Sequence, residues 1–235
     1  MAKVRRQQNP KEFFGRYFSC YFSPYLTAVF HALGLTPNQV TASMFVAGLA
    51  GAVALCFGTP AALLAGSLCL VLVNVLDTCD GEIARLTGQS SPGGEYLDRL
   101  AHYVVEGAGF LGYAVGLAAL SGRAWVVPAG AAFALLKTLE ALSRDLVFAV
   151  GLDAPEERKQ RKRKTSFRGG PLLAMLYPVL SPNGFFHVMP LLLLAGMALG
   201  DRSHAAVLGY AAAFAVLNAA GVLVRFWKLQ RAYFP

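Results

Sequence analysis

Residues 74–102 read NVLDTCDGEIARLTGQSSPGGEYLDRLAH, and they place seven charged side chains and a histidine between two long apolar stretches. Charged residues at membrane depth are costly, and they usually serve a function. A chain that keeps so many of them between two apolar segments is expected to use them there. The stretch therefore predicts two membrane helices with a polar site where they meet.

The composition of the whole chain is that of an integral membrane protein. It has 235 residues, of which 56% are hydrophobic and 14% are charged, and its mean hydropathy is +0.50. Soluble domains are typically about 45–50% apolar and about 25% charged. The net charge is +8, and the basic residues flank apolar segments. This favours anchoring beside anionic lipid over nucleic-acid binding.

Six apolar segments are long enough to cross a bilayer, which takes about 20 residues. They are residues 39–58, 61–79, 94–120, 124–148, 183–200 and 205–226. An aromatic-rich, partly charged segment, 11–33, precedes them and predicts an amphipathic helix in the membrane interface, interrupted at Pro24. The predicted fold is all-α and integral to the membrane, with six transmembrane helices after this interfacial helix. Residues 1–35 form the N-terminal part and 36–235 the six-span domain.

Two local patterns add detail to this plan. The segment TPNQVT (36–41) predicts the start of the first span, with Pro37 in the first turn and Asn38 and Thr41 as candidate caps. The segment PLLAMLYPVLSP (171–182) is apolar but short and broken by proline, which is typical of a surface or re-entrant piece.

Lysine and arginine are distributed unequally between the two sides of the predicted spans. One side collects the basic residues of both termini, the 80–98 loop and the 151–171 loop, including the run RKQRKRKTSFR (158–168). The opposite loops hold only Arg123 and Arg202. By the positive-inside rule both termini and the 74–102 site are cytoplasmic, in a multi-pass protein of the cell (plasma or inner) membrane.

Spacings of three and four residues bring the polar residues of this stretch onto two helical faces. The first face carries Asp77, Asp80, Gly81 and Ala84, and the second carries Gly94, Asp98, His102 and Glu106. If the two helices are antiparallel neighbours, the aspartates converge, and three carboxylates do not share a poorly hydrated site unpaired. A divalent cation that prefers oxygen ligands, Mg²⁺, Mn²⁺ or Ca²⁺, is the natural partner. With the guanidinium of Arg85 as a phosphate ligand, the stretch predicts a site for phosphoryl-type transfer.

The same stretch resembles the signature of the CDP-alcohol phosphotransferase (CDP-alcohol phosphatidyltransferase) family, DxxDGxxAR, about eight residues, then GxxxDxxxD. Every position matches except the last, where this chain has His102. The matching positions are Asp77, Asp80, Gly81, Ala84, Arg85, Gly94 and Asp98. Pro37, Asn38 and Thr41 also resemble the family's start of the first span, so the resemblance covers most of the chain.

The resemblance implies an activity and a set of site residues. In such enzymes an acceptor hydroxyl attacks the phosphorus distal to the cytidine of a CDP-linked substrate, and CMP leaves. Two divalent ions, Mg²⁺ or Mn²⁺, would be held by Asp77, Asp80 and Asp98. The nucleotide would be bound by Asn38, Asp77, Asp80, Gly81, Ala84, Arg85 and Gly94. Asp98 and the residue at the last motif position would take part in catalysis, and the residue at the last position would be the base. Members of the family are typically homodimers.

Three accounts of His102 are open. It is the base itself, since an unperturbed imidazole titrates near pH 6.5 and is basic enough at neutral pH. Alternatively Glu106, about 6 Å further along the helix axis, takes over. Alternatively the protein is catalytically impaired.

A second group of residues resembles acceptor-binding pairs of members that use a phosphorylated polar acceptor. Arg144 lies near the cytoplasmic end of the fourth predicted span, and Lys164 and Arg168 lie in the basic run. Such cations suit a phosphate monoester. The competing interpretations are an interfacial pair of Arg144 with Asp145 and topological anchoring by the basic run. Deeper in the span, Lys137 and Glu140 predict structural ion pairing, with each other, with Glu106 or across a dimer.

The sequence thus predicts an EC 2.7.8-type transferase of phospholipid biosynthesis. The favoured reaction transfers phosphatidyl from CDP-diacylglycerol to a polar alcohol. The alternatives are transfer of a CDP-linked head group to a lipid alcohol, a catalytically impaired nucleotide-binding relative and, outside enzymes, a cation transporter. A transporter predicts ionisable residues through the whole depth of the bundle, whereas here they concentrate on one side.

Overall fold

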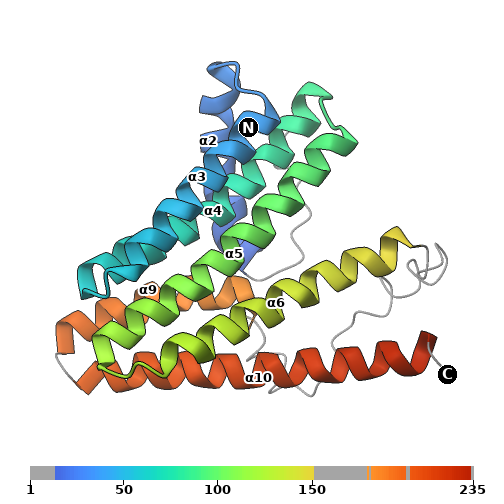
Figure 1. Cartoon of the computed structure of the whole chain (residues 1–235). Coiled ribbons are helices and arrows are strands. Elements are labelled where there is room, and N and C mark those ends of the chain that lie inside the picture. Colours follow the sequence, from blue (N-terminus) through green and yellow to red (C-terminus); the bar gives the residue numbers. More distant parts are fainter. Residues whose placement is uncertain (1–13, 151–178, 180, 200–201, 234–235) are drawn as a thin grey trace.

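The computed structural model of the chain is a bundle of helices (Figure 1). It describes residues 14–150, 179, 181–199 and 202–233, and no strand occurs in these ranges. The helices are η1 (Gly15–Ser19), α2 (Cys20–Ala32), α3 (Pro37–Cys56), α4 (Pro60–Thr87), α5 (Pro92–Ser121), α6 (Val126–Ala149), α9 (Pro182–Leu199) and α10 (Arg202–Tyr233). The predicted all-α class is confirmed. The basic run 158–168, and all of 171–182 except residues 179, 181 and 182, lie outside the described residues.

Within the described ranges, five helices are long and apolar enough to cross a membrane. They are α3, α4, α5, Val126–Val147 of α6 and Ala205–Arg231 of α10. The predicted span 183–200 forms α9, whose apolar part, Asn183–Ala198, is shorter. The predicted span 61–79 lies within α4, whose polar C-terminal part begins at Asp77, continues to Thr87 and ends where Gly88 takes the left-handed conformation. This polar extension of α4 carries most of the first half of the motif.

Three successive helices begin with the same local device. Thr36, Thr59 and Ser91 accept a hydrogen bond from a backbone N–H of the first turn, and each is followed by proline. A hydroxyl cap satisfies an otherwise unpaired N–H, and proline has no N–H that would need a partner. The prediction of Asn38 or Thr41 as the cap of α3 was therefore wrong, since Thr36 and Gln39 form a reciprocal capping box.

The seam between α3 and its two neighbours is made by small residues. α3 packs against both α4 and α5 along its length, whereas α4 and α5 contact each other much less. A Cβ added to Gly112 of α5 would lie 2.6 Å from the carbonyl oxygen of Ala52, and one added to Gly66 of α4 would lie 2.6 Å from that of Gly51. Glycine at these positions lets the backbones approach closely. α3 thereby fixes the distance between the helices that carry the two halves of the motif.

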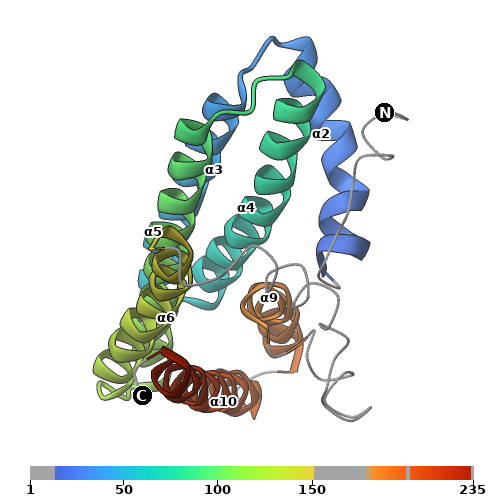
Figure 2. The same cartoon turned by 90° about the vertical axis from the view of Figure 1, so that its right-hand side faces the viewer.

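The N-terminal helix α2 is fastened to α4. Figure 2 shows α2 running beside α4, and its residues Ser23, Pro24 and Thr27 are buried. The predicted interruption at Pro24 was wrong: the helix continues through this residue, directly after the π-helical turn η1. That α2 lies in the membrane interface stays a prediction.

Candidate active site

Three carboxylates on the polar extension of α4 point toward three different helices. Asp77 faces α5, where its Oδ1 lies 2.8 Å from Nε2 of His102. Asp80 faces α3 and accepts a hydrogen bond of 2.7 Å from the hydroxyl of Thr41. Glu82 faces α2, where it is fully buried and accepts hydrogen bonds from two hydroxyls. The motif-bearing part of α4 is thus held from three sides.

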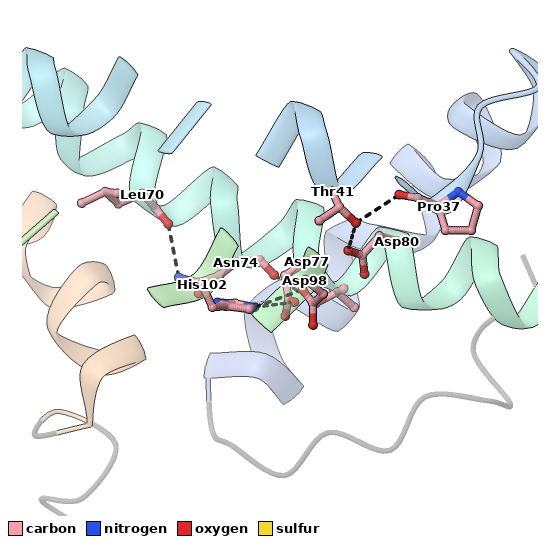
Figure 3. A network of polar contacts seen from close by, with 9 residues as sticks. Pro37, Thr41, Leu70, Asn74, Asp77, Asp80, Asp98 and His102 are labelled. Carbon is pink, nitrogen blue, oxygen red and sulfur yellow. Dashed lines mark hydrogen bonds and ion pairs between the residues drawn. The ribbon is translucent and has the colours of Figure 1, made fainter. Parts of the chain in front are cut away.

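The α5 half of the motif faces the α4 half. Asp98 and His102 lie one turn apart on α5, and His102 Nε2 is 3.5 Å from Asp98 Oδ1 as well as close to Asp77 (Figure 3). Asp98 Oδ1 is buried, and among the described residues it has no hydrogen-bond partner. A buried carboxylate oxygen without a donor is costly and calls for a cation or a donor. The convergence of Asp77 and Asp98 predicted from helical spacing is present.

The residues present fit a divalent metal ion. Asp77, Asp98 and His102 each offer one ligand atom, and these atoms lie within 4.8 Å of one another. Carboxylate oxygens and an imidazole nitrogen are donors that divalent cations accept. Asp80, predicted with Asp77 and Asp98, is outside this group because it turns toward Thr41 (Figure 3). That Asp80 binds metal stays a prediction.

A cavity of about 460 Å³ lies beside this cluster, between the polar end of α4 and the starts of α3 and α5. Five of the seven predicted nucleotide-binding residues line it: Asn38, Asp80, Gly81, Ala84 and Gly94. A Cβ on Gly94 would lie 3.2 Å from Oδ1 of Asn38, and one on Gly81 would lie 3.2 Å from Nη1 of Arg85. Side chains at these two positions would crowd the cavity wall and the guanidinium beside it. Of the other two, Arg85 directly follows Ala84 and Asp77 precedes Asp80 by about one helical turn, and neither lines the cavity.

A second polar network joins α5 to α6 at the same end of the bundle. Arg99 donates to Asp145 (Nη1 to Oδ1, 2.5 Å) and to Glu95 (Nη2 to Oε1, 2.6 Å). The Tyr103 hydroxyl also donates to Asp145. The sequence suggests the neighbouring Arg144 as one partner of Asp145, but it does not reveal that Asp145 contacts α5. No local pattern reveals this contact, because it depends on how α5 and α6 pack.

The acceptor-side candidates are only partly described. Arg144 is exposed on α6, whereas Lys164 and Arg168 lie outside the described residues. Deeper in α6, the predicted pair is present: Lys137 Nζ lies 2.6 Å from Glu140 Oε2, and both are buried. Arg225 of α10 contacts the same carboxylate. This network joins α6 to α10, and we interpret it as a structural contact between these helices.

The role of Thr41 in the site could not be predicted from the sequence. Its position inside a helix-start pattern suggested a cap, yet its hydroxyl lies 2.7 Å from Asp80 Oδ2 and 3.2 Å from the carbonyl of Pro37. The sequence pattern of Pro37, Asn38 and Thr41 indicates that Thr41 belongs to the site, but it does not indicate that Asp80 is its hydrogen-bond partner. Thr41 and Asp80 are 39 positions apart in sequence, so this is a tertiary contact.

Comparison with known proteins agrees with this geometry. No curated protein matches the chain. The sequence model of one family, described as CDP-alcohol phosphatidyltransferase, matches residues 34–217. The match includes α3, α4 and α5 whole, and with them every residue of the cluster and of the cavity lining. The chain belongs to the CDP-alcohol phosphatidyltransferase family.

Proposed function

We propose that the chain catalyses metal-dependent transfer of a phosphatidyl group from CDP-diacylglycerol to the hydroxyl of a polar alcohol, with release of CMP. The observation that carries this proposal is the cluster of Asp77, Asp98 and His102 beside a cavity lined by Asp80, Gly81 and Gly94. Ligands for a cation and a small-residue cradle thus lie together, which suits a pyrophosphate. Family membership supports the transferase class.

In the proposed reaction the acceptor oxygen forms a bond to the phosphorus distal to the cytidine. The bond from this phosphorus to the bridging oxygen breaks, and that oxygen leaves with CMP. Asp77 and Asp98 would hold divalent ions, Mg²⁺ or Mn²⁺ and two in number by family resemblance, and Asp80 would join them. When bound, these ions supply charge stabilisation on the pyrophosphate.

The residues of the chain orient the reactants and move the proton. Asn38, Gly81, Ala84 and Gly94 would enclose the nucleotide, and Arg85 would bind a phosphate oxygen. His102 stands at the position that the family uses for the base, and its Nε2 faces Asp77 and Asp98. It would take the proton of the acceptor hydroxyl, a task for which an imidazole suits neutral pH.

The remaining parts of the proposal concern the setting of the reaction. The protein would lie in the plasma or inner membrane of the cell. Both termini and the active site would face the cytoplasm. Arg144, Lys164 and Arg168 would bind a phosphate on the acceptor, and the active form would be a homodimer. Among alternatives, transfer of a CDP-linked head group to a lipid alcohol uses the same cluster with the substrates exchanged.

The proposal is tested by calorimetric titration of the purified protein with CDP, with and without Mn²⁺ or Mg²⁺. We expect binding that requires the metal and that Asp77→Asn abolishes. Asp145→Asn is the matched control, because Asp145 is a similarly exposed aspartate at the same end of the bundle that faces Arg99. A wild-type protein that binds no CDP with metal present, or an Asp77→Asn variant that binds like wild type, would contradict the proposal. Ion flux in proteoliposomes without nucleotide would favour the transporter.

A further inference from the structure

A second cavity lies in the other half of the bundle. It has a volume of about 780 Å³, lies between α5, α6, α9 and α10, and is open on one side. Along α5 its lining starts at Phe110, about 12 Å of helix beyond His102, and continues away from the active site to Ser121. It therefore shares no residue with the candidate active site.

The walls of this cavity are aromatic and small apolar side chains. Phe110 and Phe133 meet edge to face with ring centroids 5.1 Å apart, and Phe185 lies 4.4 Å from Phe214. On α10 the lining includes Gly209, which has no side chain, and a Cβ built on it meets no atom within 4 Å. An apolar space of this size at membrane depth does not stay empty, and water finds no hydrogen-bond partners on such walls. The lining calls for an apolar occupant.

The length of the cavity matches one leaflet of a bilayer. Its lining on α5, from Phe110 to Ser121, rises by about 16 Å, and its lining on α10, from Ala205 to Val216, rises by the same amount. The hydrocarbon core of a bilayer is about 30 Å thick, so one leaflet accounts for about 15 Å. Both stretches lie in helices long and apolar enough to span the membrane. An acyl chain of one leaflet has the length that the space requires.

The mouth of the cavity carries a cation and an indole. Arg123 and Trp125, in the short connection between α5 and α6, both line it. Arg123 is exposed and forms no ion pair with any residue that the structure describes. Trp125 is 63% exposed, as is typical of indoles at the level of lipid head groups. A guanidinium at this level attracts a phosphate of net negative charge.

We infer that this cavity is a binding site for an anionic phospholipid, with one acyl chain between α5, α6 and α10 and the phosphate at Arg123. This goes beyond the proposed reaction, since the site lies at the end of the bundle away from the aspartate cluster. The bound lipid fills the space between α6 and α10, whose direct contact is slight compared with that between α5 and α6.

Native mass spectrometry of the full-length protein in detergent tests the inference. The probes are phosphatidylglycerol and phosphatidylcholine with identical acyl chains. We expect wild type to bind phosphatidylglycerol about tenfold more tightly, a difference of about 1.4 kcal/mol. Arg123→Gln should remove this preference and retain the weaker binding of both lipids. Gly209→Leu should weaken the binding of both, because leucine enters the space that the chain would occupy.

The matched control is Gly221→Leu. Gly221 is also an exposed glycine of α10 with no atom within 4 Å of an added Cβ, but it does not line the cavity. Its leucine variant should bind both lipids like wild type. Equal affinities of wild type for the two lipids, or unchanged lipid binding by Gly209→Leu, would overturn the inference. A cavity filled by a second copy of the chain would give that last result together with a change in oligomeric mass.

A second measurement needs no change inside the cavity. The chain has two tryptophans, so Trp227→Phe leaves Trp125 as the sole indole. In vesicles with acyl chains brominated near their carboxyl ends, we expect brominated phosphatidylglycerol to quench Trp125 more than brominated phosphatidylcholine at equal mole fraction. Equal quenching by the two would contradict a site for an anionic lipid. Neither measurement involves a nucleotide, so its failure leaves the proposed reaction untouched.

Discussion

At the scale of the residue, His102 decides how the site works. It stands 2.8 Å from Asp77 and 3.5 Å from Asp98, at the motif position where the family has aspartate. If it accepts the proton of the acceptor hydroxyl, His102→Gln should lower the rate of CMP release by about 100-fold or more. The affinity for CDP, measured by calorimetry, should change much less than this rate, because Asp77 and Asp98 would still hold the metal on which CDP binding depends.

His102→Asp separates the three accounts of this residue. A large gain in CMP release would mean that position 102 is impaired in this chain, and a loss would mean that the imidazole has a role of its own. The added negative charge should in either case tighten metal binding, since two unit charges 4 Å apart interact by about 4 kcal/mol at an effective dielectric of 20. Competition between Mg²⁺ and Mn²⁺, followed by electron paramagnetic resonance, measures this change. Unchanged release in His102→Gln would favour Glu106 as the base.

Thr41 is the second residue whose exchange is informative. Its hydroxyl donates to the buried carboxylate of Asp80, and a hydrogen bond to a charged group contributes about 1.5–3 kcal/mol. We expect Thr41→Val to weaken metal-dependent CDP binding in the calorimetric titration, because Asp80 loses the donor that orients it. Thr41→Ser keeps the hydroxyl and is the control. Wild-type binding by the valine variant would show that Asp80 needs no such support.

At the scale of the element, the α2–α4 contact rests on a buried carboxylate. Ser23 Oγ and Thr27 Oγ1 donate to Glu82 at 2.7 and 2.6 Å, and all three side chains are buried. Removing one donor from a buried charged acceptor costs about 1–3 kcal/mol. We therefore expect Ser23→Ala to lower the thermal unfolding midpoint of the protein in detergent.

Ser43→Ala is the control for this prediction. The Ser43 hydroxyl bonds the carbonyl of Val40 in its own helix, so its loss affects no contact between helices. Equal midpoints for Ser23→Ala and Ser43→Ala would show that α2 is not fastened to α4 through Glu82.

The elements also show how far a sequence leads. Hydropathy predicts the spans because a bilayer demands about 20 apolar residues, and helical spacing predicts the meeting of Asp77 with Asp98. Helical spacing also predicts that α4 continues through Ala84, but it does not reveal that α2 and α3 hold this polar end. The hydrogen-bond and ion-pair partners of Asp80, Glu82 and Asp145 could not be predicted from the sequence. Each lies on another helix, and its place depends on packing that no local pattern encodes.

At the scale of the whole molecule, the charge distribution predicts an orientation. By the order of the predicted spans, the basic residues of both termini and of 151–171 belong to the side of the 80–98 stretch, and the opposite loops hold only Arg123 and Arg202. In a variant without the four native cysteines, a single cysteine replacing Ala124 should react with a membrane-impermeant thiol reagent in intact cells. One replacing Ser90 should react only after permeabilisation. The reverse pattern would contradict the cytoplasmic placement of the site.

The convergence of α4 on three helices has a consequence for how the protein is made. Every side chain of the aspartate cluster, of its supports and of the adjoining cavity belongs to α2, α3, α4, α5 or the short turns between them. Chains fold from the N-terminus as they leave the ribosome, so we expect the reaction centre to assemble during membrane insertion, before the second half of the polypeptide exists. The later helices would then add only to the surroundings of a centre that is already complete.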